Sequence, residues 1–334
     1  MNKHKCAVVG CGRIGALLEV LDPKREKPAS HVSAYKACSE FFDLVAVCDI
    51  NEELAKWVSE RFQVPHYFKD VKEMLDKVDL DVVSVCTPPD GRFEVICSLA
   101  EHPKKPRLIF AEKPIEANLY EAEAIKEVCQ KNGVKLMVNH TRRFSYAFKS
   151  LWYDVNFNKF GKLLLFRGLF SGDVVSDGVH MADLVNWFST EETVISVENV
   201  KTPYLIFEVD LIFSEARVMI KDNGARFELY RPKESRRYQY IDELELAEVL
   251  PYKFSFSEAM LNALKEIDYC LRLNREPSCG ADEGIEALRL ALKWREKFGK
   301  KKVKLDSGSS LLQLHSAKRK RSTESNSSNS SNSY

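Results

Sequence analysis

A glycine-rich turn near the amino end carries the clearest chemical signal in this sequence. Gly10, Gly12 and Gly15 form a G-x-G-x-x-G pattern, which follows an apolar run and opens a helical one. Gly10 permits a tight turn, Gly12 lets a pyrophosphate approach the backbone, and Gly15 lets the helix pack closely on the strand. The N–H groups at the start of the helix then face the phosphate charge. With Arg13 and Ile14 inside it, the pattern predicts a dinucleotide-binding turn.

An acidic residue at the end of the next apolar run indicates which dinucleotide would bind. Asp49 closes the segment 44–49, and no Arg or Lys follows it within residues 50–54. A carboxylate there can accept hydrogen bonds from an adenosine ribose and repel a 2′-phosphate, so the sequence favours NAD over NADP. Asp49 lies further from the glycines than the usual spacing of about 20 residues. The extra length falls in residues 22–30, where two prolines predict a loop.

A second group of polar residues follows the apolar run 108–111. This group is Glu112-Lys113-Pro114. In an open α/β sheet, ligands bind outside the carboxyl ends of the strands, so we expect Lys113 to project toward the cofactor crevice. The Lys113–Pro114 peptide bond is a candidate for the cis form, which would fix the direction of the lysine. Without the glycine turn upstream, these residues would be interpreted as a solvated strand end.

The elements that would position these residues alternate regularly over residues 1–140. Strands are predicted at 5–9, 44–49, 81–87, 107–111 and 135–139, and helices at 31–40, 52–62, 71–77, 93–101 and 119–132. Most of the strand-like runs are apolar throughout, as in parallel strands that are buried on both faces. The sequence therefore predicts an α/β fold that begins with a Rossmann domain, a doubly wound parallel sheet, over residues 1–140.

The pattern changes over residues 141–305, where a second α/β domain is predicted. Strands are predicted at 162–170, 194–200, 204–213, 217–221, 225–230 and 237–241, and helices at 179–188, 255–273 and 282–298. Short turns between the strands indicate a mostly antiparallel sheet, and Asp222-Asn223-Gly224 is a strong hairpin signal. The Ser- and Asn-rich residues 306–334 hold too little apolar surface to fold, so they are predicted to be a disordered, solvated tail. This tail includes a short basic cluster at 318–321.

Composition excludes several classes of protein. The 334 residues suit two domains, and 50 Lys and Arg against 49 Asp and Glu give a net charge of +1. A balanced chain has no electrostatic footprint for nucleic acid or for an anionic membrane. No apolar run approaches the roughly 18 residues of a membrane helix. The nine cysteines form no C-x-x-C pair, so we expect no metal site and a location in the reducing cytoplasm.

The order of these motifs resembles that of the Gfo/Idh/MocA oxidoreductases, the relatives of glucose–fructose oxidoreductase and inositol dehydrogenase. The resemblance spans about residues 4–305 and rests on the glycine turn, Asp49, Thr87-Pro88-Pro89, Glu112-Lys113-Pro114 and the strand-rich second half. It implies a Rossmann domain followed by an α/β domain with an open, mostly antiparallel sheet. That sheet often carries the oligomer contact, so we expect a homodimer or homotetramer. Its other face would close the substrate site.

The resemblance also implies roles for single residues. Thr87 and Pro88 would lie against the cofactor, and Lys113 would touch both the substrate and the nicotinamide ribose. Family members usually carry D-x-x-x-H at the start of a helix in the second domain, and His180 aligns with the acid/base histidine of this motif.

This sequence departs from the family pattern at two positions. The residue four before His180 is Ser176, and the acid is shifted by one to Asp177. Asp177 would either partner His180 from another angle or cap the helix. The family's histidine after the T-P motif is absent, and Arg92 stands five residues after Thr87.

Two adjacent arginines follow the predicted strand at 135–139. Arg142 and Arg143 could hold a carboxylate, a phosphate or a nucleotide-sugar diphosphate. They could equally belong to a segment that joins the domains and pairs with surface acids. We include both, together with Ser176, among the expected substrate contacts.

The sequence predicts an NAD-dependent oxidoreductase that acts on a secondary alcohol or ketone of a sugar, cyclitol or nucleotide-linked sugar. The nicotinamide takes the hydride while a base takes the hydroxyl proton. The expected catalytic residues are Lys113, His180 and Asp177, and the expected cofactor contacts are Gly10, Gly12, Arg13, Ile14, Gly15, Asp49, Thr87, Pro88, Glu112 and Lys113. Two alternatives stay open: an NAD(P)-sensing regulator of the same fold without turnover, and a reductase of a non-sugar substrate such as a tetrapyrrole or an imine.

Overall fold

A computed structural model describes residues 2–299 of the chain. Residues 2–296 form one compact unit. The predicted tail at 306–334, its basic cluster and the last residues of the predicted second domain lie outside the described residues.

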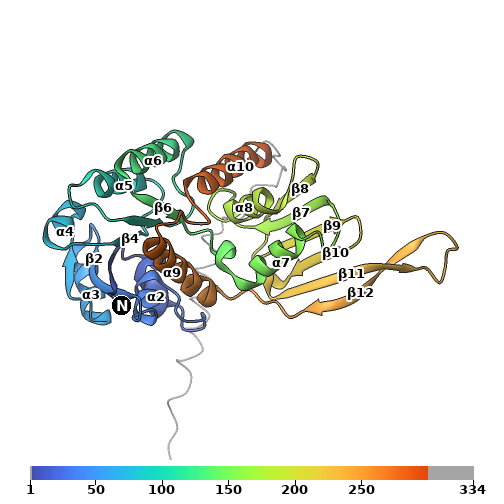
Figure 1. Ribbon diagram of the computed structural model, residues 1–334, viewed down its shortest axis with the longest axis horizontal. Coiled ribbons are helices and arrows are strands. Elements are labelled where there is room, and N and C mark those ends of the chain that lie inside the picture. The colour runs from blue at the N-terminus through green and yellow to red at the C-terminus, as the bar shows by residue number, and fades with distance from the viewer. Residues whose placement is uncertain (1, 300–334) are drawn as a thin grey trace, which may run out of the picture. The chain divides into compact units, whose positions relative to one another are not determined.

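The first sheet has six parallel strands in the order β3-β2-β1-β4-β5-β6 (Figure 1). They are β1 (His4–Val9), β2 (Phe42–Cys48), β3 (His66–Phe68), β4 (Val82–Val85), β5 (Leu108–Ala111) and β6 (Lys135–Val138). Every residue of β4 and β5 is buried, because helices cover both faces of the sheet. The strand order reverses between β1 and β4, and in such sheets ligands bind beside the carboxyl ends at that point.

The helices of this part begin and end where the sequence offers caps. They are η1 (Arg13–Leu17), α1 (Leu18–Leu21), α2 (His31–Ala37), α3 (Glu52–Phe62), α4 (Val71–Lys77), α5 (Arg92–Glu101) and α6 (Leu119–Asn132). Asn51, Asp70 and Asn118 each accept a backbone N–H of the first turn, at α3, α4 and α6 respectively. In Figure 1, α5 and α6 lie on one side of the sheet, and α2 and α3 lie on the other.

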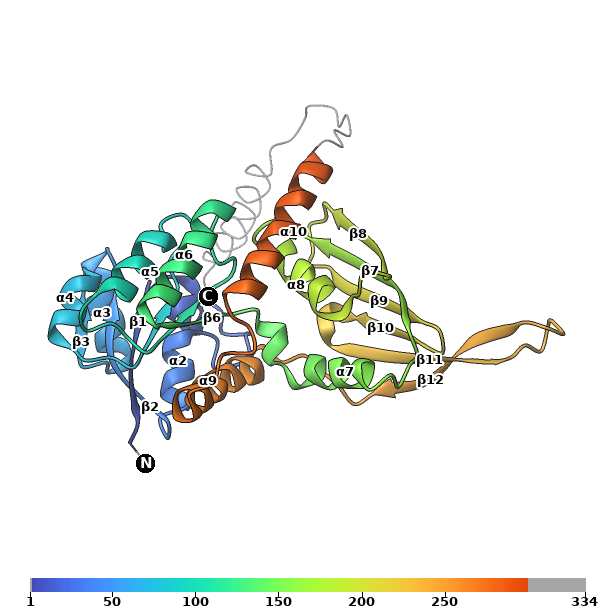
Figure 2. The same cartoon turned by 45° about the horizontal axis from the view of Figure 1, so that its top comes forward.

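The second sheet has six strands in the order β12-β11-β10-β9-β7-β8 and is antiparallel except between β7 and β8. Its strands are β7 (Leu163–Ser171), β8 (Val194–Val200), β9 (Phe207–Phe213), β10 (Arg217–Lys221), β11 (Arg226–Glu234) and β12 (Asp242–Leu250). The helices α7 (Tyr146–Asn156) and α8 (Gly178–Phe188) accompany this sheet (Figure 2). Phe148 of α7 packs edge-on against Phe227 of β11, with ring centroids 5.4 Å apart. The predicted fold class is therefore confirmed.

The last two helices return to the first sheet. These are α9 (Phe256–Leu273) and α10 (Ala281–Gly299). Ala259 and Ile267 of α9 and Leu288 of α10 belong to the same buried core as β1 and β5. The predicted boundaries at 140 and 305 stay a prediction, and this shared core shows that residues beyond 255 also stabilise the first sheet.

The sequence prediction was wrong at the β11–β12 hairpin. No strand covers 237–241, because the Ser235 hydroxyl accepts the N–H groups of Arg237 and Tyr238 and so bends the chain there. The strands β3 and β12 and the helix α7 were not predicted. The hairpin predicted at residues 222–224 is confirmed: it joins β10 to β11, with Asn223 at φ 58° and Gly224 at φ 96°.

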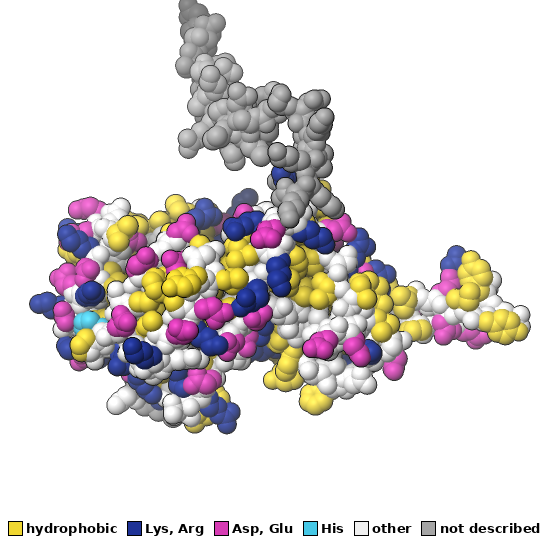
Figure 3. All heavy atoms as spheres, turned by 90° about the horizontal axis from the view of Figure 1, so that it is seen from above, with side chains coloured by type: hydrophobic (Ala, Val, Ile, Leu, Met, Phe, Trp, Pro, Cys, Tyr) yellow, Lys and Arg dark blue, Asp and Glu magenta, His cyan; other side chains and the backbone are white. Residues whose placement is uncertain are grey.

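The surface carries charges of both signs. On the face shown in Figure 3, acidic and basic side chains are interspersed, and apolar side chains gather at the tip of the β11–β12 hairpin. Tyr238, Tyr240 and Ile241 of this tip are more than half exposed. Within residues 2–299, no helix has the length and apolar character to cross a bilayer, and no group of His, Cys, Asp and Glu could hold a metal ion.

Candidate cofactor and active site

The three glycines of the turn meet different surroundings. Gly10 has a φ of +91°, and a Cβ there would lie 2.7 Å from the backbone nitrogen of Thr87. A Cβ on Gly15 would lie 1.9 Å from the carbonyl oxygen of Gly10. A Cβ on Gly12, in contrast, would meet no atom within 4 Å. The fold therefore requires Gly10 and Gly15 for its own packing, whereas the bare backbone at Gly12 faces open space that a ligand can enter.

A cavity of about 1230 Å³ lies at the carboxyl ends of the first sheet and extends to the second. Most of the expected site residues line it: Gly10, Gly12, Arg13, Ile14, Asp49, Thr87, Pro88, Glu112, Lys113, Arg142, Asp177 and His180. Gly15, Arg143 and Ser176 do not. The cavity exceeds the roughly 300–1,000 Å³ of pockets for drug-sized ligands, so it has room for a dinucleotide and a small substrate.

The donors and acceptors along this cavity fit a dinucleotide. The two carboxylate oxygens of Asp49 accept the N–H groups of Cys11, at 2.7 Å, and Asn51, at 2.9 Å, which fixes the acid beside the glycine turn. The hydroxyl oxygen of Thr87 is buried and has no hydrogen-bond partner among the described residues. Buried polar atoms are normally paired, so a ligand is the natural partner of this hydroxyl.

Glu112 belongs to a buried network behind the cavity wall. Its Oε1 accepts a hydrogen bond from Asn139 Nδ2 at 2.6 Å and lies 2.9 Å from His31 Nε2. The other ring nitrogen of His31 lies 3.1 Å from the hydroxyl of Ser84. Burial alone would raise the pKa of Glu112, but the hydrogen bond and charge of His31, helped by Lys113, hold this pKa at about 2. The carboxylate is therefore ionised, and these buried groups occupy one of its oxygens.

Arg92 joins the two loops that follow the strands β4 and β5. Its guanidinium donates to the carbonyl oxygens of Glu112, Pro114 and Thr87, which follow the neighbouring strands β5 and β4. The side chain is almost fully buried. Sequence reasoning noted Arg92 only as the residue standing where the family has a histidine, because nothing local shows that one guanidinium reaches three carbonyls.

Lys113 connects the first sheet to the segment before α8. Its peptide bond to Pro114 is cis, as expected. Its Nζ donates to the carbonyl oxygen of Ser176 at 2.9 Å. Burial lowers the pKa of Lys113, while the charges of Glu112 and Asp177 oppose this shift. An ammonium has three donors, so the remaining N–H groups are available to a substrate oxygen.

His180 lies in the first turn of α8 and lines the same cavity. Burial, followed by the positive charges of Lys113 and Arg142, lowers the pKa of His180 well below its usual value. Its imidazole is therefore neutral at neutral pH and can accept a proton. The ring of His140 lies edge-on to it, with centroids 6.2 Å apart. Sequence reasoning did not select His140, because its segment showed only the two arginines as a signal.

Asp177, three residues before His180, makes neither of the two contacts considered above. Asp177 is the N-cap residue of α8 by position, but its side chain accepts no N–H of that helix. Its Oδ2 accepts the N–H of Asp173 at 2.9 Å instead, and no hydrogen bond joins it to the His180 ring among the described contacts. The capping interpretation is therefore wrong. Asp177 still lines the cavity, where its charge acts on Lys113.

The two adjacent arginines point to different surroundings. Arg143 donates from Nε to Asp183 at 2.8 Å, and its guanidinium carbon lies 5.2 Å from the Trp187 ring. Arg142 lines the cavity, with its guanidinium carbon 3.6 Å above the Phe207 ring. Of the two, the structure therefore brings only Arg142 to Lys113 and His180.

The pKa of Glu112 predicts how acid affects the fold. Since this pKa is about 2 in the folded protein and about 4.3 in an unfolded chain, ionised Glu112 stabilises the fold above the higher value. That stabilisation is lost as the pH falls toward the lower one. We expect Glu112→Gln to lower the free energy of unfolding at neutral pH by on the order of 3 kcal/mol, and the gap to narrow steadily below pH about 4.3. Urea titrations at several pH values measure this difference in the free energy of unfolding between the wild type and the variant.

The exposed Glu127→Gln serves as the matched control for this prediction. A gap between wild type and Glu112→Gln that stays constant down to the acid limit would contradict the depressed pKa.

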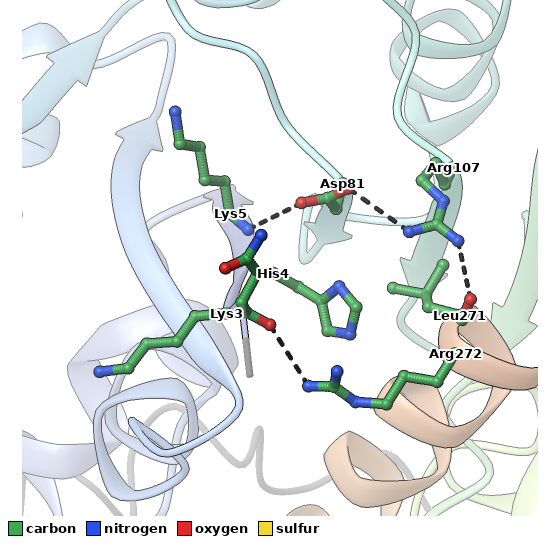
Figure 4. Close-up of a pocket in the computed structure, with 8 residues that line it drawn as sticks. Lys3, His4, Lys5, Asp81, Arg107, Leu271 and Arg272 are labelled. Atoms are coloured by element: carbon green, nitrogen blue, oxygen red, sulfur yellow. Dashed lines mark hydrogen bonds and ion pairs between the residues drawn. The ribbon is translucent and has the colours of Figure 1, made fainter.

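A second pocket lies at the opposite edge of the first sheet, near the amino ends of β1, β4 and β5 (Figure 4). Residues that line it include Lys3, His4, Lys5, Asp81, Arg107, Leu271 and Arg272. Asp81 accepts the backbone N–H of Lys5 and lies 3.6 Å from Arg107, which donates to the Leu271 carbonyl. These contacts join the amino ends of the strands to α9. Ligands of such sheets bind at the opposite edge, beside the carboxyl ends of the strands.

Comparison with known proteins agrees with this geometry. Residues 4–140 match the model of the GFO_IDH_MocA family, described as an oxidoreductase family with an NAD-binding Rossmann fold. A myo-inositol 2-dehydrogenase of Thermotoga maritima is 27% identical over 158 residues, which cover 47% of this chain and 42% of that protein. A scyllo-inositol 2-dehydrogenase (NAD(+)) of Bacillus subtilis is 27% identical over 167 residues, covering 50% and 44%. The matches thus span less than half the length of these relatives.

A solved structure extends the likeness of fold to the second sheet. The apo scyllo-inositol dehydrogenase from Lactobacillus casei superposes with a TM-score of 0.70 at 16% identity, covering 90% of this chain and 97% of that one. The glycine turn, the lysine after β5 and the strand order of the first sheet occur together with the family match. Over residues 4–140, the chain is therefore similar to the Gfo/Idh/MocA family of oxidoreductases.

Proposed function

We propose that the protein is an NAD-dependent oxidoreductase that transfers a hydride between nicotinamide and a secondary alcohol or ketone of a sugar, cyclitol or nucleotide-linked sugar. One observation carries the proposal: Lys113 and His180, from distant parts of the chain, line the same cavity as the bare backbone of Gly12. A cation, a neutral base and a dinucleotide turn are what this chemistry requires. The inositol dehydrogenases among the relatives support this substrate class.

The charge states of the two side chains suit complementary roles. When bound, the nicotinamide accepts or returns the hydride. Lys113 stays close to its point of action because the Ser176 carbonyl holds its Nζ at 2.9 Å. As an ammonium it donates to the reacting oxygen and stabilises negative charge there. His180, neutral because burial lowers its pKa, accepts the hydroxyl proton and returns it in the reverse direction.

The main test is hydride transfer itself. Purified protein is incubated with NAD⁺ and a panel of sugars and cyclitols, or with NADH and the matching keto compounds, and the absorbance of NADH is followed. Turnover of at least one compound in either direction is expected. Tight NADH binding with no turnover across the whole panel would support the alternative of a dinucleotide-sensing protein. A coloured ligand that copurifies would instead point to a reductase of a non-sugar substrate.

We further propose that NAD is the cofactor rather than NADP. Asp49 lies beside the glycine turn with its carboxylate fixed by two backbone N–H groups. We expect NADH to bind at least about tenfold more tightly than NADPH, a difference of about 1.4 kcal/mol, and Asp49→Ser to reduce this ratio. Fluorescence titration with both nucleotides measures it. Tighter binding of NADPH would overturn this use of Asp49, and Arg13 and Lys69 line the cavity as candidate ligands of a 2′-phosphate.

We propose that the protein forms a homodimer or homotetramer through its second sheet. Measuring the mass of the protein in solution tests the number of subunits. All nine cysteines carry free thiols, which supports a reducing, cytoplasmic location.

A further inference from the structure

The ring of His180 has no hydrogen-bond partner among the residues that the structure describes. The carboxylate three residues before it, that of Asp177, accepts the N–H of Asp173 instead. A neutral imidazole carries its proton on one of two nitrogens, and a hydrogen bond at that nitrogen decides which one is left to act as a base. A base that must take a proton from a substrate therefore needs a partner that fixes its tautomer, as the aspartate of a Ser-His-Asp triad does.

A second histidine lies beside His180. His140 directly precedes the 3₁₀ turn Thr141–Phe144, and its ring is edge-on to that of His180, with centroids 6.2 Å apart. His140 is only 1% exposed, yet within residues 2–299 neither of its ring nitrogens makes a hydrogen bond. Buried polar atoms are normally paired, so two unpaired nitrogens on one buried ring require an explanation. Packing alone does not supply one, because an apolar ring would fill the same space without that cost.

The carboxylate of Asp183 faces one of these two nitrogens. Asp183 lies three residues after His180, on the same side of α8, and is 1% exposed. Its Oδ1 accepts the Nε–H of Arg143 at 2.8 Å, and its Oδ2 lies 3.9 Å from His140 Nδ1. Hydrogen bonds between catalytic groups are often long until the substrate complex forms. A proton on Nδ1 of His140 would face this carboxylate, and Nε2 of the same ring would then be an acceptor.

The charges around His140 favour its neutral form. Burial lowers the pKa of His140, the charge of Asp183 opposes this shift, and the charges of Arg143 and Lys113 add to it. The ring is therefore neutral at neutral pH and can accept a hydrogen bond. This matters because Lys113 already places positive charge beside His180, and a second cation there would prevent His180 from taking a proton.

We propose that His140, oriented by Asp183, is a positioning residue that holds His180 in one tautomer. Nε2 of His140 accepts the ring N–H of His180, so the other nitrogen of His180 carries no proton and is the one available in the cavity. The hydroxyl proton of the substrate moves to that nitrogen, while His140 itself neither gains nor loses a proton. This inference rests on the proposed oxidoreductase function and adds two residues to its machinery.

The first test reads the tautomers directly and needs no turnover. Long-range proton–nitrogen NMR spectra of protein labelled with ¹⁵N-histidine distinguish ring nitrogens that carry a proton from those that do not. The His140→Phe and His180→Phe variants assign the signals. At neutral pH we expect His140 to carry its proton on Nδ1, and His180 to occupy a single tautomer that becomes a mixture in His140→Phe. A His140 proton on Nε2, or a His180 tautomer that is the same in His140→Phe as in the wild type, would overturn the inference.

A glutamine at the same position separates positioning from packing. The amide of His140→Gln can donate to Asp183 and accept from the His180 ring, so this variant should keep the single tautomer although it fills the space of the ring less well. A purely structural role would give the opposite ranking, since phenylalanine preserves the shape of the ring. His66→Phe, at an exposed histidine of β3, is the matched control and should leave the His180 signals unchanged. Urea titrations show whether both variants of His140 fold, and the tautomer of His140 in the wild type is decisive if they do not.

Kinetics separate this inference from the function on which it rests. With a sugar or cyclitol that turns over, His140→Phe should lower kcat by about 10²-fold, at the lower end of what a general base contributes. KM should change by less than about twofold, and His140→Gln should recover part of kcat. Turnover of His140→Phe at the wild-type rate would leave the oxidoreductase in place and overturn the positioning role. The expected tautomers without hydride transfer in either direction would support the positioning of His180 and overturn the oxidoreductase.

Discussion

Replacing Lys113 with methionine is expected to lower kcat/KM for the reacting substrate by about 10²–10³-fold, the usual cost of removing one preorganised donor to a developing oxyanion. The methionine keeps the length of the side chain and removes its charge. The hydrogen bond to the Ser176 carbonyl is lost as well. NADH should still bind, because the glycine turn and Asp49 follow other strands of the sheet, β1 and β2.

Steady-state kinetics measure the loss of kcat/KM, and NADH titration on the same preparation measures whether the cofactor still binds. Lys126→Met is the matched control, since Lys126 lies on α6 and pairs with Asp282 away from the cavity. It should turn over at the wild-type rate. A Lys113→Met protein that also turned over at that rate would remove Lys113 from the mechanism, whatever the cavity binds.

The first sheet could be predicted because its strands have a strong local signature. Continuous apolar runs such as Leu108–Ala111 belong to strands covered on both faces, and capping residues such as Asn118 and Gly133 mark where helices begin and end. The strand β3 has only three residues and is half-exposed, so it carries no such pattern. The strand β12 has glutamates and leucines that are mostly exposed on both faces, and its pairing with β11 is what makes it a strand.

The site could be predicted only where function resides in a local motif. The glycine turn, Asp49 and Lys113 each sit directly at the end of a strand, and strand ends of a parallel sheet converge. The residues that fix these motifs in place do not stand at predicted strand ends, so the sequence gives no such signal for them. Arg92 reaches three carbonyls, and His31 meets Glu112 across 81 positions of sequence. The partnership of His180 with the ring of His140 likewise depends on how α8 packs near the end of β6.

Replacing Gly12 with valine is expected to remove NADH binding while leaving the fold intact. Gly12 has a φ of −65°, outside the left-handed region that favours glycine, and a Cβ there would meet nothing within 4 Å. The free energy of unfolding should therefore change by no more than about 0.5 kcal/mol. A side chain in that space would keep a pyrophosphate away from the N–H groups behind it. Losing two charge-assisted hydrogen bonds costs about 3 kcal/mol, so NADH affinity should fall about 100-fold.

The other glycines of the turn provide the contrast that makes this prediction specific to cofactor binding. Gly15→Ala places a Cβ 1.9 Å from the Gly10 carbonyl oxygen, so it should destabilise the fold itself. Urea unfolding and NADH fluorescence titration on both variants should therefore give opposite patterns: lost affinity with unchanged stability for Gly12→Val, and lost stability for Gly15→Ala. If Gly12→Val bound NADH as the wild type does, the dinucleotide could not lie across this turn, and the lysine after β5 would have no hydride chemistry to assist.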